Sequence, residues 1–234
     1  RVTTAAEGFV FDWNGSTYKF TGNFAPINQI LGMFKYGRGK IPALSTLAEQ
    51  ESQEKIVAVI PGSFKPPHRG HMDMVAHYAG IADEVIVYVS PKTREANGVQ
   101  VTSEQAKQIF DLYVKALGLR NVRVEESPSA SPVTAAYKHV EEVAKPGEKV
   151  LLGTSTKGGD QSRFAKSVQN YAAEGVEVLD PMKYAFDPQP PELSATDFRE
   201  AISKGEDITP FIPQGVDPSE VLEILGNDQS PSSE

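Results

Sequence analysis

Residues 56–71 read IVAVIPGSFKPPHRGH, and this stretch decides the fold. It begins with five consecutive apolar residues, 56–60, a run that is typical of a strand buried on both faces of a parallel sheet. A loop rich in Pro and Gly ends the run, and residues 70–79 then show the spacing of apolar positions that predicts a helix. The stretch therefore predicts the first strand, loop and helix of an α/β fold.

The rest of the chain repeats this alternation. Further apolar runs predict strands at residues 84–89, 122–125, 150–153 and 176–179, and helical spacing lies at residues 103–117, 132–144 and 161–173. Together these segments predict a doubly wound, Rossmann-like sheet of five parallel strands with helices on both faces. Ligands of such sheets bind at the carboxyl ends of the strands, near the point where the strand order reverses. The site is therefore expected just after Ile60, Val89 and Leu152.

Composition excludes several functions. The 234 residues carry a formal net charge of -8, which argues against a protein that coats nucleic acid, because that role needs a basic face. The absence of Cys excludes disulfides, a thiol nucleophile and thiolate metal sites. No apolar run approaches the roughly 20 residues of a membrane span, and no secretory leader is evident. We therefore expect a cytoplasmic protein that has no nucleic-acid or membrane partner and meets anionic substrates locally.

We expect three parts in the chain. Residues 1–54 form an N-terminal appendage and linker, residues 55–204 form the α/β domain, and residues 205–234 form a C-terminal extension with a disordered tail. In the appendage, Asn14-Gly15 joins two β-prone runs, which is the strongest short-range signal for a hairpin, and residues 26–36 show helical spacing. The chain begins with Arg1, and the appendage is interpreted either as packed on the domain or as the tail of a fused upstream domain.

Two histidines follow the first strand, at the start of the next helix. A helix N-terminus offers unpaired backbone N–H groups and a positive dipole end, which together bind anions. His68 and His71 lie on the same side of the first turn, so both can donate N–H groups to phosphate oxygens. Gly70 lets a triphosphate approach the backbone, and Gly62 permits a sharp turn. The arrangement suits stabilisation of the charge that grows on a reacting phosphorus, and it requires no protein nucleophile.

The histidines admit other interpretations. A His-x-x-His pair can bind a metal ion, but no second cluster of His or Cys completes the ligand set. The pair can also be two ordinary surface residues of a loop. For His77 and His139, which fall inside predicted helices, a packing or surface role is expected.

The pattern Gly62-x-Phe64-x-Pro66-x-His68-x-Gly70-His71 resembles the signature of the cytidylyltransferase-like nucleotidyltransferases. That family includes adenylyltransferases of nicotinamide mononucleotide, nicotinate mononucleotide and pantetheine phosphate, and cytidylyltransferases of glycerol phosphate and choline phosphate. The resemblance covers residues 55–204 and implies transfer of AMP or CMP from a nucleoside triphosphate to a phosphorylated small molecule. It also implies release of pyrophosphate without a covalent enzyme intermediate, and Mg²⁺ bound mainly through the triphosphate.

A second part of the resemblance lies near the end of the domain. Ser194 and Asp197 form the Ser-x-x-Asp pattern of a helix cap, so a second helix N-terminus is predicted there. Residues 193–199 resemble the family's I-S-S-T-x-x-R signature, with Ser194, Thr196 and Arg199 in register. The resemblance implies that this helix start and Arg199 hold the β- and γ-phosphates.

Several further positions bear on the site and its substrate. Lys92 resembles a lysine of the pantetheine-phosphate branch, and Arg94 follows it in the same loop. Gly153 fits the place where the family contacts the nucleobase, but the Arg-Gly-x-Arg stretch of the pantetheine-phosphate branch is missing there. Lys65 stands where many members have an acidic residue or Gln. The Pro66-Pro67 pair and the Ser-x-Thr form near Arg199 lean towards the nicotinamide-mononucleotide branch.

The resemblance implies a complete site. The predicted catalytic residues are His68, His71, Lys92 and Arg199, and the predicted nucleotide-binding residues are Gly62, Ser63, Phe64, Lys65, Gly70, Gly153, Ser194 and Thr196. No protein side chain is predicted to bind the metal. A catalytically silent nucleotide-binding regulatory or assembly module is the alternative, although intact groups aimed at the transition state favour an enzyme. The sequence leaves open which acceptor is used, whether the nucleotide is ATP or CTP, and whether the chain forms a homo-oligomer.

The appendage carries a resemblance of its own. Residues 7–11, Glu-Gly-Phe-Val-Phe, and residues 18–20, Tyr-Lys-Phe, resemble the last two motifs of the ATP-dependent nucleic-acid ligase fold, with one Lys where two are usual. The resemblance implies that the chain is the carboxyl-terminal portion of a fusion. The other interpretation is a hairpin and helix packed on the domain.

Overall fold

The structure, a computed structural model, describes residues 2–5, 8–13, 16–20, 55–157, 164 and 168–226. The chain forms two compact units, Arg1–Glu51 and Ser52–Glu234. Within the described ranges, no helix combines the length and the apolar character that crossing a membrane requires.

The smaller unit contains a three-stranded antiparallel sheet in the order β1-β2-β3. Its strands are β1 (Val2–Ala5), β2 (Gly8–Trp13) and β3 (Ser16–Phe20). The pairing of Trp13 with Ser16 confirms the predicted hairpin, whereas β1 was not predicted. The helix predicted at residues 26–36 and the Glu7 position of the ligase-like motif lie outside the described residues.

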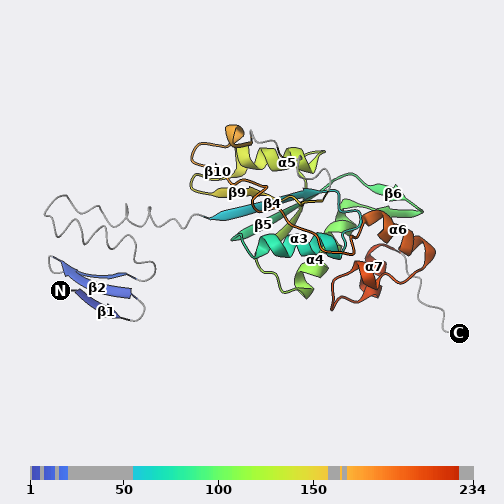
Figure 1. Cartoon of the computed structure of the whole chain (residues 1–234), viewed down its shortest axis with the longest axis horizontal. Helices are drawn as coiled ribbons and strands as arrows, with labels where there is room; N and C mark the ends of the chain where they lie inside the picture. The colour runs from blue at the N-terminus through green and yellow to red at the C-terminus, as the bar shows by residue number, and fades with distance from the viewer. Residues whose placement is uncertain are drawn as a thin grey trace. The chain divides into compact units, whose positions relative to one another are not determined.

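The larger unit is built on the five-stranded parallel sheet that the sequence predicts, and the structure shows its strand order to be β10-β9-β4-β5-β8 (Figure 1). Its strands are β4 (Ile56–Gly62), β5 (Glu84–Val89), β8 (Val122–Glu126), β9 (Lys149–Leu152) and β10 (Glu177–Val178). The chain proceeds outward from β4 through β5 to β8, and then returns to the other side of β4 with β9. The strand order therefore reverses between β4 and β9, which is where ligands of this architecture bind.

Helices cover both faces of this sheet (Figure 1). On one face, alternate β4 side chains such as Ala58 and Ile60 share a core with α3 (Arg69–Ala79), α4 (Ser103–Ala116), α6 (Ala195–Lys204) and α7 (Pro218–Ile224). On the other face, Val57 and Val59 share a core with α5 (Pro132–Lys138), the π turn His139–Val143 and the 3-10 turn Val168–Tyr171. The apolar runs are continuous because successive side chains enter different cores.

The structure differs from the sequence predictions in three segments. Residues 132–144 form the short helix α5 and then a π turn, instead of one α-helix. Of the helix predicted at 161–173, residues 161–163 and 165–167 lie outside the described residues, and residues 168–171 form only a 3-10 turn. Arg94, expected in a loop, begins the hairpin of β6 (Arg94–Ala96) and β7 (Val99–Val101), for which the sequence analysis made no prediction.

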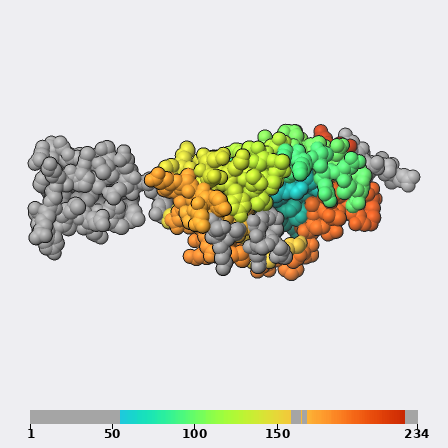
Figure 2. All heavy atoms as spheres, turned by 90° about the horizontal axis from the view of Figure 1, so that it is seen from above, coloured from blue at the N-terminus to red at the C-terminus, as the bar shows by residue number. Residues whose placement is uncertain are grey.

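The chain after α6 contributes to the same core. A 3-10 turn at Thr209–Phe211 and helix α7 follow, and α7 packs against α4. Buried apolar residues of this segment belong to the α3–α4 core: Ile208, Ile212, Val216, Val221 and Leu225. Figure 2 shows teal atoms from the start of this unit flanked by green atoms and by orange atoms of its C-terminal part. Segments far apart in the sequence therefore meet on this face.

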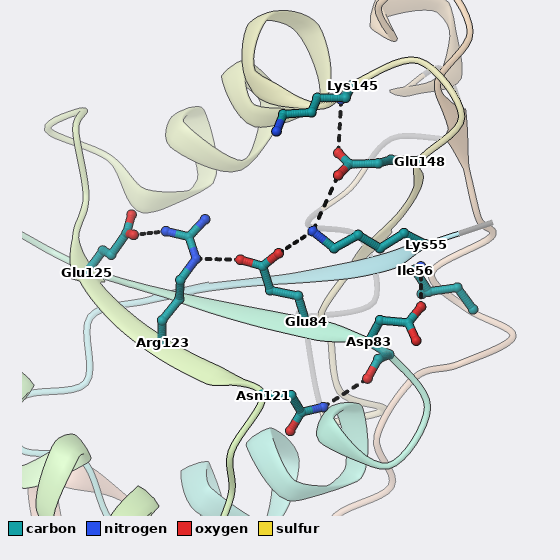
Figure 3. Close-up of polar contacts among 10 residues, drawn as sticks. Lys55, Ile56, Asp83, Glu84, Asn121, Arg123, Glu125, Lys145 and Glu148 are labelled. Atoms are coloured by element: carbon teal, nitrogen blue, oxygen red, sulfur yellow. Dashed lines mark hydrogen bonds and ion pairs between the residues drawn. The ribbon is translucent and has the colours of Figure 1, made fainter. Parts of the chain in front are cut away.

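The amino-terminal edge of the sheet carries a network of ion pairs (Figure 3). Glu84, the first residue of β5, accepts from Lys55 Nζ at 2.5 Å and from Arg123 Nε at 2.7 Å. Arg123 also pairs with Glu125, and Lys55 lies 3.5 Å from a carboxylate oxygen of Glu148. The Lys55 hydrogen bond is the main reason that the pKa of Glu84 is lowered. The acidic and basic side chains of this network are therefore paired with one another.

Candidate active site

The two signature histidines lie where β4 passes into α3. His68 is the N-cap residue of α3, and its backbone N–H donates to Nδ1 of His71 at 3.2 Å. The two rings are stacked, with their centroids 3.6 Å apart and an angle of 25° between their planes. Because Nδ1 of His71 accepts this hydrogen bond, the proton of a neutral His71 ring resides on Nε2. His71 therefore presents an N–H donor at the carboxyl edge of the sheet.

The loop before these histidines is shaped by close packing between Gly62 and Phe64. A Cβ atom at Gly62 would lie 2.3 Å from Cζ of Phe64, so only glycine fits beneath this ring. Phe64 is buried and has a φ of 53°. Its ring meets those of His71 and Phe110 edge to face, at centroid distances of 4.9 and 5.0 Å. The Phe64 ring thus supports the imidazole of His71 from the core.

The second signature forms the start of α6. Ser194 is the N-cap residue, and its Oγ accepts from the backbone N–H of Asp197 at 3.1 Å, so the predicted helix cap is confirmed. One turn later, Nη2 of Arg199 donates to Oγ1 of Thr196 at 3.2 Å. Nη1 of Arg199 donates to the backbone carbonyl of Lys65. The guanidinium therefore joins α6 to the loop that follows β4.

Two adjoining pockets open at this edge of the sheet, with volumes of about 300 and 370 Å³. The first lies against the β9 side, where it is bounded by Ser155, Lys157 and the segment 186–195. The second lies against the loop 61–65 and includes Arg94, Gly153 and Arg199. The walls of both pockets include His71, Met74 and Ala195. His71 therefore stands at the junction of the two pockets.

Both signature imidazoles are neutral at pH 7. Burial lowers the pKa of His68 to about 4, with a contribution from the Lys157 cation and an opposing one from Asp197. Burial also holds the pKa of His71 well below its usual range, and positive charge at His68 and Lys157 acts in the same direction. A neutral imidazole keeps one N–H group, which can donate to a phosphate oxygen.

The second pocket is cationic. Lys65 is 2% exposed, and its Nζ has no hydrogen-bond partner among the described residues. Burial lowers the pKa of Lys65 to about 8, against an opposing effect of the Glu126 carboxylate. Arg199 is also buried, its Nε has no partner within the described residues, and its pKa is lowered by burial and by nearby Arg94. Buried polar groups of this kind are usually satisfied by a ligand or water.

Lys92 and Arg94, expected together in one loop at the site, lie in different surroundings. Lys92 is exposed and lines neither of the two pockets, and its backbone N–H donates to Oγ of Ser90 at 3.3 Å. Arg94 starts the β6–β7 hairpin and reaches the second pocket. The signal for this hairpin was Asn97-Gly98, whose residues have φ values of 58° and 73° as a tight hairpin requires. Lys92, predicted to be catalytic, therefore does not line either pocket together with the other predicted catalytic residues.

Lys157 is a residue that the sequence analysis missed. It follows β9, lines the first pocket and lowers the pKa of both signature histidines. Its Nζ lies 2.8 Å from a carboxylate oxygen of Glu192 across the pocket rim. The available signal was its place shortly after Gly153, at the carboxyl end of a predicted strand.

The remaining predicted residues line a pocket, and the glycines among them also pack closely against neighbouring side chains. Ser63 lines the second pocket, as does Gly153, at which a Cβ atom would lie 2.7 Å from Cγ1 of Ile60. Gly70 lines the first pocket, where a Cβ atom would lie 3.3 Å from the His68 ring.

The two other histidines have the packing and surface roles expected for them. His77 is exposed and bonded to the Tyr184 carbonyl. His139 is buried beside the Tyr88 hydroxyl. Neither lines either of the two pockets.

Comparison with known proteins agrees with this geometry. The family model described as cytidylyltransferase-like matches residues 59–201. A phosphopantetheine adenylyltransferase of Arthrobacter sp. (strain FB24) is 29% identical over 161 residues, which cover 68% of this chain and 92% of that protein. The phosphopantetheine adenylyltransferase of Aquifex aeolicus (strain VF5) is 54% identical over a shorter stretch of 67 residues, 29% of this chain and 39% of that protein.

Solved structures share the fold. A bifunctional NMN adenylyltransferase/ADP ribose pyrophosphatase from Francisella tularensis superposes with a TM-score of 0.55 at 18% identity, covering 73% of this chain and 48% of that one. A putative nicotinate-nucleotide adenylyltransferase from Vibrio parahaemolyticus gives a TM-score of 0.51 at 19% identity, over 74% of this chain and 99% of that one. The signature loop, the second helix start and the matched family model together identify the chain as a nucleotidyltransferase that belongs to the cytidylyltransferase-like family.

Proposed function

We propose that the chain transfers the adenylyl group of ATP to an acceptor that carries a phosphate group, with release of pyrophosphate. The observation that carries this proposal is the position of His71 in the wall of both pockets. The nucleoside, the leaving pyrophosphate and the incoming acceptor all meet at the α-phosphorus, so this atom belongs at such a junction. ATP is preferred over CTP because the relatives with similar sequences are named as adenylyltransferases.

The chemistry proposed is a direct displacement. A phosphate oxygen of the acceptor forms a bond to the α-phosphorus, and the bond from that phosphorus to the oxygen bridging to the β-phosphorus breaks. The electron pair of the broken bond leaves with pyrophosphate. His71 Nε2–H and the neighbouring His68 ring donate to oxygens of the reacting phosphates, where negative charge grows in the transition state. The enzyme aligns the reactants and forms no covalent intermediate.

Arg199, in the wall of the second pocket, is suited to the phosphates that leave. Arg199 is held by Thr196 and by the Lys65 carbonyl, so its guanidinium is fixed before a ligand arrives. We assign it to the β- and γ-phosphates, which become pyrophosphate and gain charge as they leave. Preorganised donors of this kind favour the transition state because they need not reorient during the reaction.

We propose that Mg²⁺ is bound through the triphosphate, where it neutralises phosphate charge. Within the described ranges, no group of three or more His, Cys, Asp or Glu side chains is arranged to hold a metal ion. A site formed by cationic and neutral donors fits a metal that enters with its phosphates, because Mg²⁺ commonly keeps several waters and few protein ligands.

For the acceptor we propose phosphopantetheine first. A relative named for that substrate aligns over 92% of its length with this chain. The missing Arg-Gly-x-Arg stretch after β9 opposes this choice and keeps nicotinamide mononucleotide as the second candidate.

One panel of reactions tests the function. Pyrophosphate release would be measured with ATP and with CTP, each against phosphopantetheine, nicotinamide mononucleotide, glycerol phosphate and choline phosphate, with wild type and His71→Ala. We expect release with ATP and one acceptor only, and loss of it in the variant. Release with CTP in place of ATP would overturn the choice of nucleotide. Equal release by both proteins would overturn the assigned chemistry.

A further inference from the structure

The amine of Lys65 differs from those of other lysines in this unit. Lys55, Lys157 and Lys204 are all partly exposed, and the amine of each lies within 4 Å of a carboxylate oxygen, as an ion pair requires. Lys65 is instead 2% exposed, and its Nζ has no hydrogen-bond partner among the described residues. A buried cation without a partner costs stability, so its retention points to a ligand.

The fold holds Lys65 in this position through its backbone. The carbonyl of Lys65 accepts from Nη1 of Arg199, so the residue is fixed while its side-chain amine stays unpaired within the described part of the chain. Glu126, at the end of β8, acts on the amine through its charge, and no ion pair joins the two residues. The amine is thus available to an anion that enters the second pocket.

The neighbours of Lys65 indicate which anion this is. The first pocket lies on the β9 side of His71, with Ser155 and Lys157 in its wall. Lys65 lines the second pocket together with Arg94, which follows β5, and its pKa responds to the charge of Glu126, which ends β8. Lys65 therefore lies toward the β8 end of the second pocket, across the His71 junction from the residues that line only the first pocket, where space remains for an acceptor beside the α-phosphorus.

We propose that Lys65 binds the phosphate group of the acceptor and thereby selects acceptors that carry a phosphomonoester. The inference rests on the proposed adenylyl transfer, in which the first pocket holds the nucleoside. Arg94 supplies a second cation to the same phosphate, and Arg199 remains with the pyrophosphate that leaves. An ammonium that pairs with a phosphate only when the acceptor is bound suits a selective site.

The test compares Lys65→Met, which removes the charge, with Lys65→Arg, which keeps it, and with Lys204→Met, an exposed control. Calorimetry would measure binding of inorganic phosphate to protein saturated with the α,β-methylene analogue of ATP, and binding of the analogue itself. We expect Lys65→Met to weaken phosphate binding by about 10-fold or more, as loss of a charged hydrogen bond does. Binding of the analogue should change by less than about 2-fold in all variants, and Lys65→Arg and Lys204→Met should retain phosphate binding.

Thermal melting separates this role from a structural one. Because Lys65→Met removes a buried, unpaired charge, the ligand-free variant should melt at or above the wild-type temperature. A lower melting temperature, unchanged phosphate binding, or equal weakening of phosphate and analogue would each overturn the proposal. If no acceptor in the panel releases pyrophosphate while phosphate binding still depends on Lys65, the proposed function fails and the phosphate site stands.

A pH series gives an independent readout. The charged and titratable groups that face Lys65 are Glu126, Arg94, Arg199 and His71. Guanidinium groups stay charged, and His71 is already neutral at pH 7. Since the Lys65 pKa is about 8, wild-type phosphate binding should weaken as the pH rises through that value. Lys65→Arg should bind with little change over the same range, and a parallel loss in both proteins would contradict the assignment.

Discussion

The charged groups at the two edges of the parallel sheet differ in whether they have partners. At the amino edge, Glu84 receives hydrogen bonds from both Lys55 and Arg123, so the ionic groups satisfy one another. At the carboxyl edge, buried nitrogens of Lys65 and Arg199 have no partner within the described part of the chain. Unsatisfied buried groups cost stability, whereas partly exposed ion pairs contribute little. The comparison teaches that the unpaired edge is the one arranged for a ligand.

The largest effect is expected at the carboxyl edge. His71→Ala should lower the rate of adenylyl transfer by about 100-fold or more, because a preorganised donor to a transition-state oxygen is worth a few kcal/mol. Single-turnover kinetics would measure the rate, with a melting curve beside it. A rate loss that merely follows a large fall in melting temperature would mean that His71 supports the fold.

A substitution of Arg199 tests which phosphates of the nucleotide are bound at the carboxyl edge. Arg199→Ala should weaken binding of ATP by about 10-fold to 100-fold, because charged hydrogen bonds to the β- and γ-phosphates are lost. AMP lacks those phosphates and should bind almost as before. Calorimetric titration with each nucleotide gives the ratio, and equal weakening of both would remove Arg199 from the leaving group.

Gly62 tests how the core supports the site. Gly62→Ala should destabilise the protein by about 1–3 kcal/mol, the usual cost of overpacking, because its Cβ would lie 2.3 Å from the Phe64 ring. Urea unfolding measures the loss. The matched control is Gly80→Ala, whose Cβ would lie 3.4 Å from its nearest neighbour, the His77 carbonyl oxygen. Similar losses in both variants would show that the Phe64 contact is unimportant.

The smallest effect is expected at the amino edge. Glu84→Gln should cost about 1 kcal/mol or less and leave the transfer rate within about 2-fold, because the ion pairs are partly exposed. The pKa of Glu84 is lowered in the fold, so its contribution is present above its unfolded pKa and disappears as the pH falls through the folded value. Urea unfolding at neutral and acidic pH would measure this. A difference between wild type and variant that grows on acidification would contradict it.

The strands of the sheet could be predicted because a strand whose side chains are buried in two cores must be apolar at successive positions. The sequence also predicted the cap at Ser194 and the position of His68 and His71 because these features depend on neighbouring residues. It could not predict the burial of Lys65, whose backbone is held by Arg199, 134 positions away.

The different places of Lys92 and Arg94 follow from a signal that the sequence does contain. Lys92 was favoured over Arg94 because it resembles a lysine of the pantetheine-phosphate branch, and the Asn97-Gly98 turn, which forms the hairpin that starts at Arg94, was not used. The hairpin gives Arg94 a fixed place in the wall of the second pocket. A two-residue turn signal therefore decides which of two neighbouring cations reaches the site.

The bond between Arg199 and the Lys65 carbonyl has a consequence for synthesis of the protein. A ribosome that has completed β10, at Glu177–Val178, has made every strand of the parallel sheet but not α6. The signature loop then lacks the guanidinium that fixes it, although its histidines were translated long before. A nascent chain therefore acquires a fixed signature loop only after α6 leaves the ribosome, and with the proposed function we expect ATP to stabilise the finished protein and not its shorter precursors.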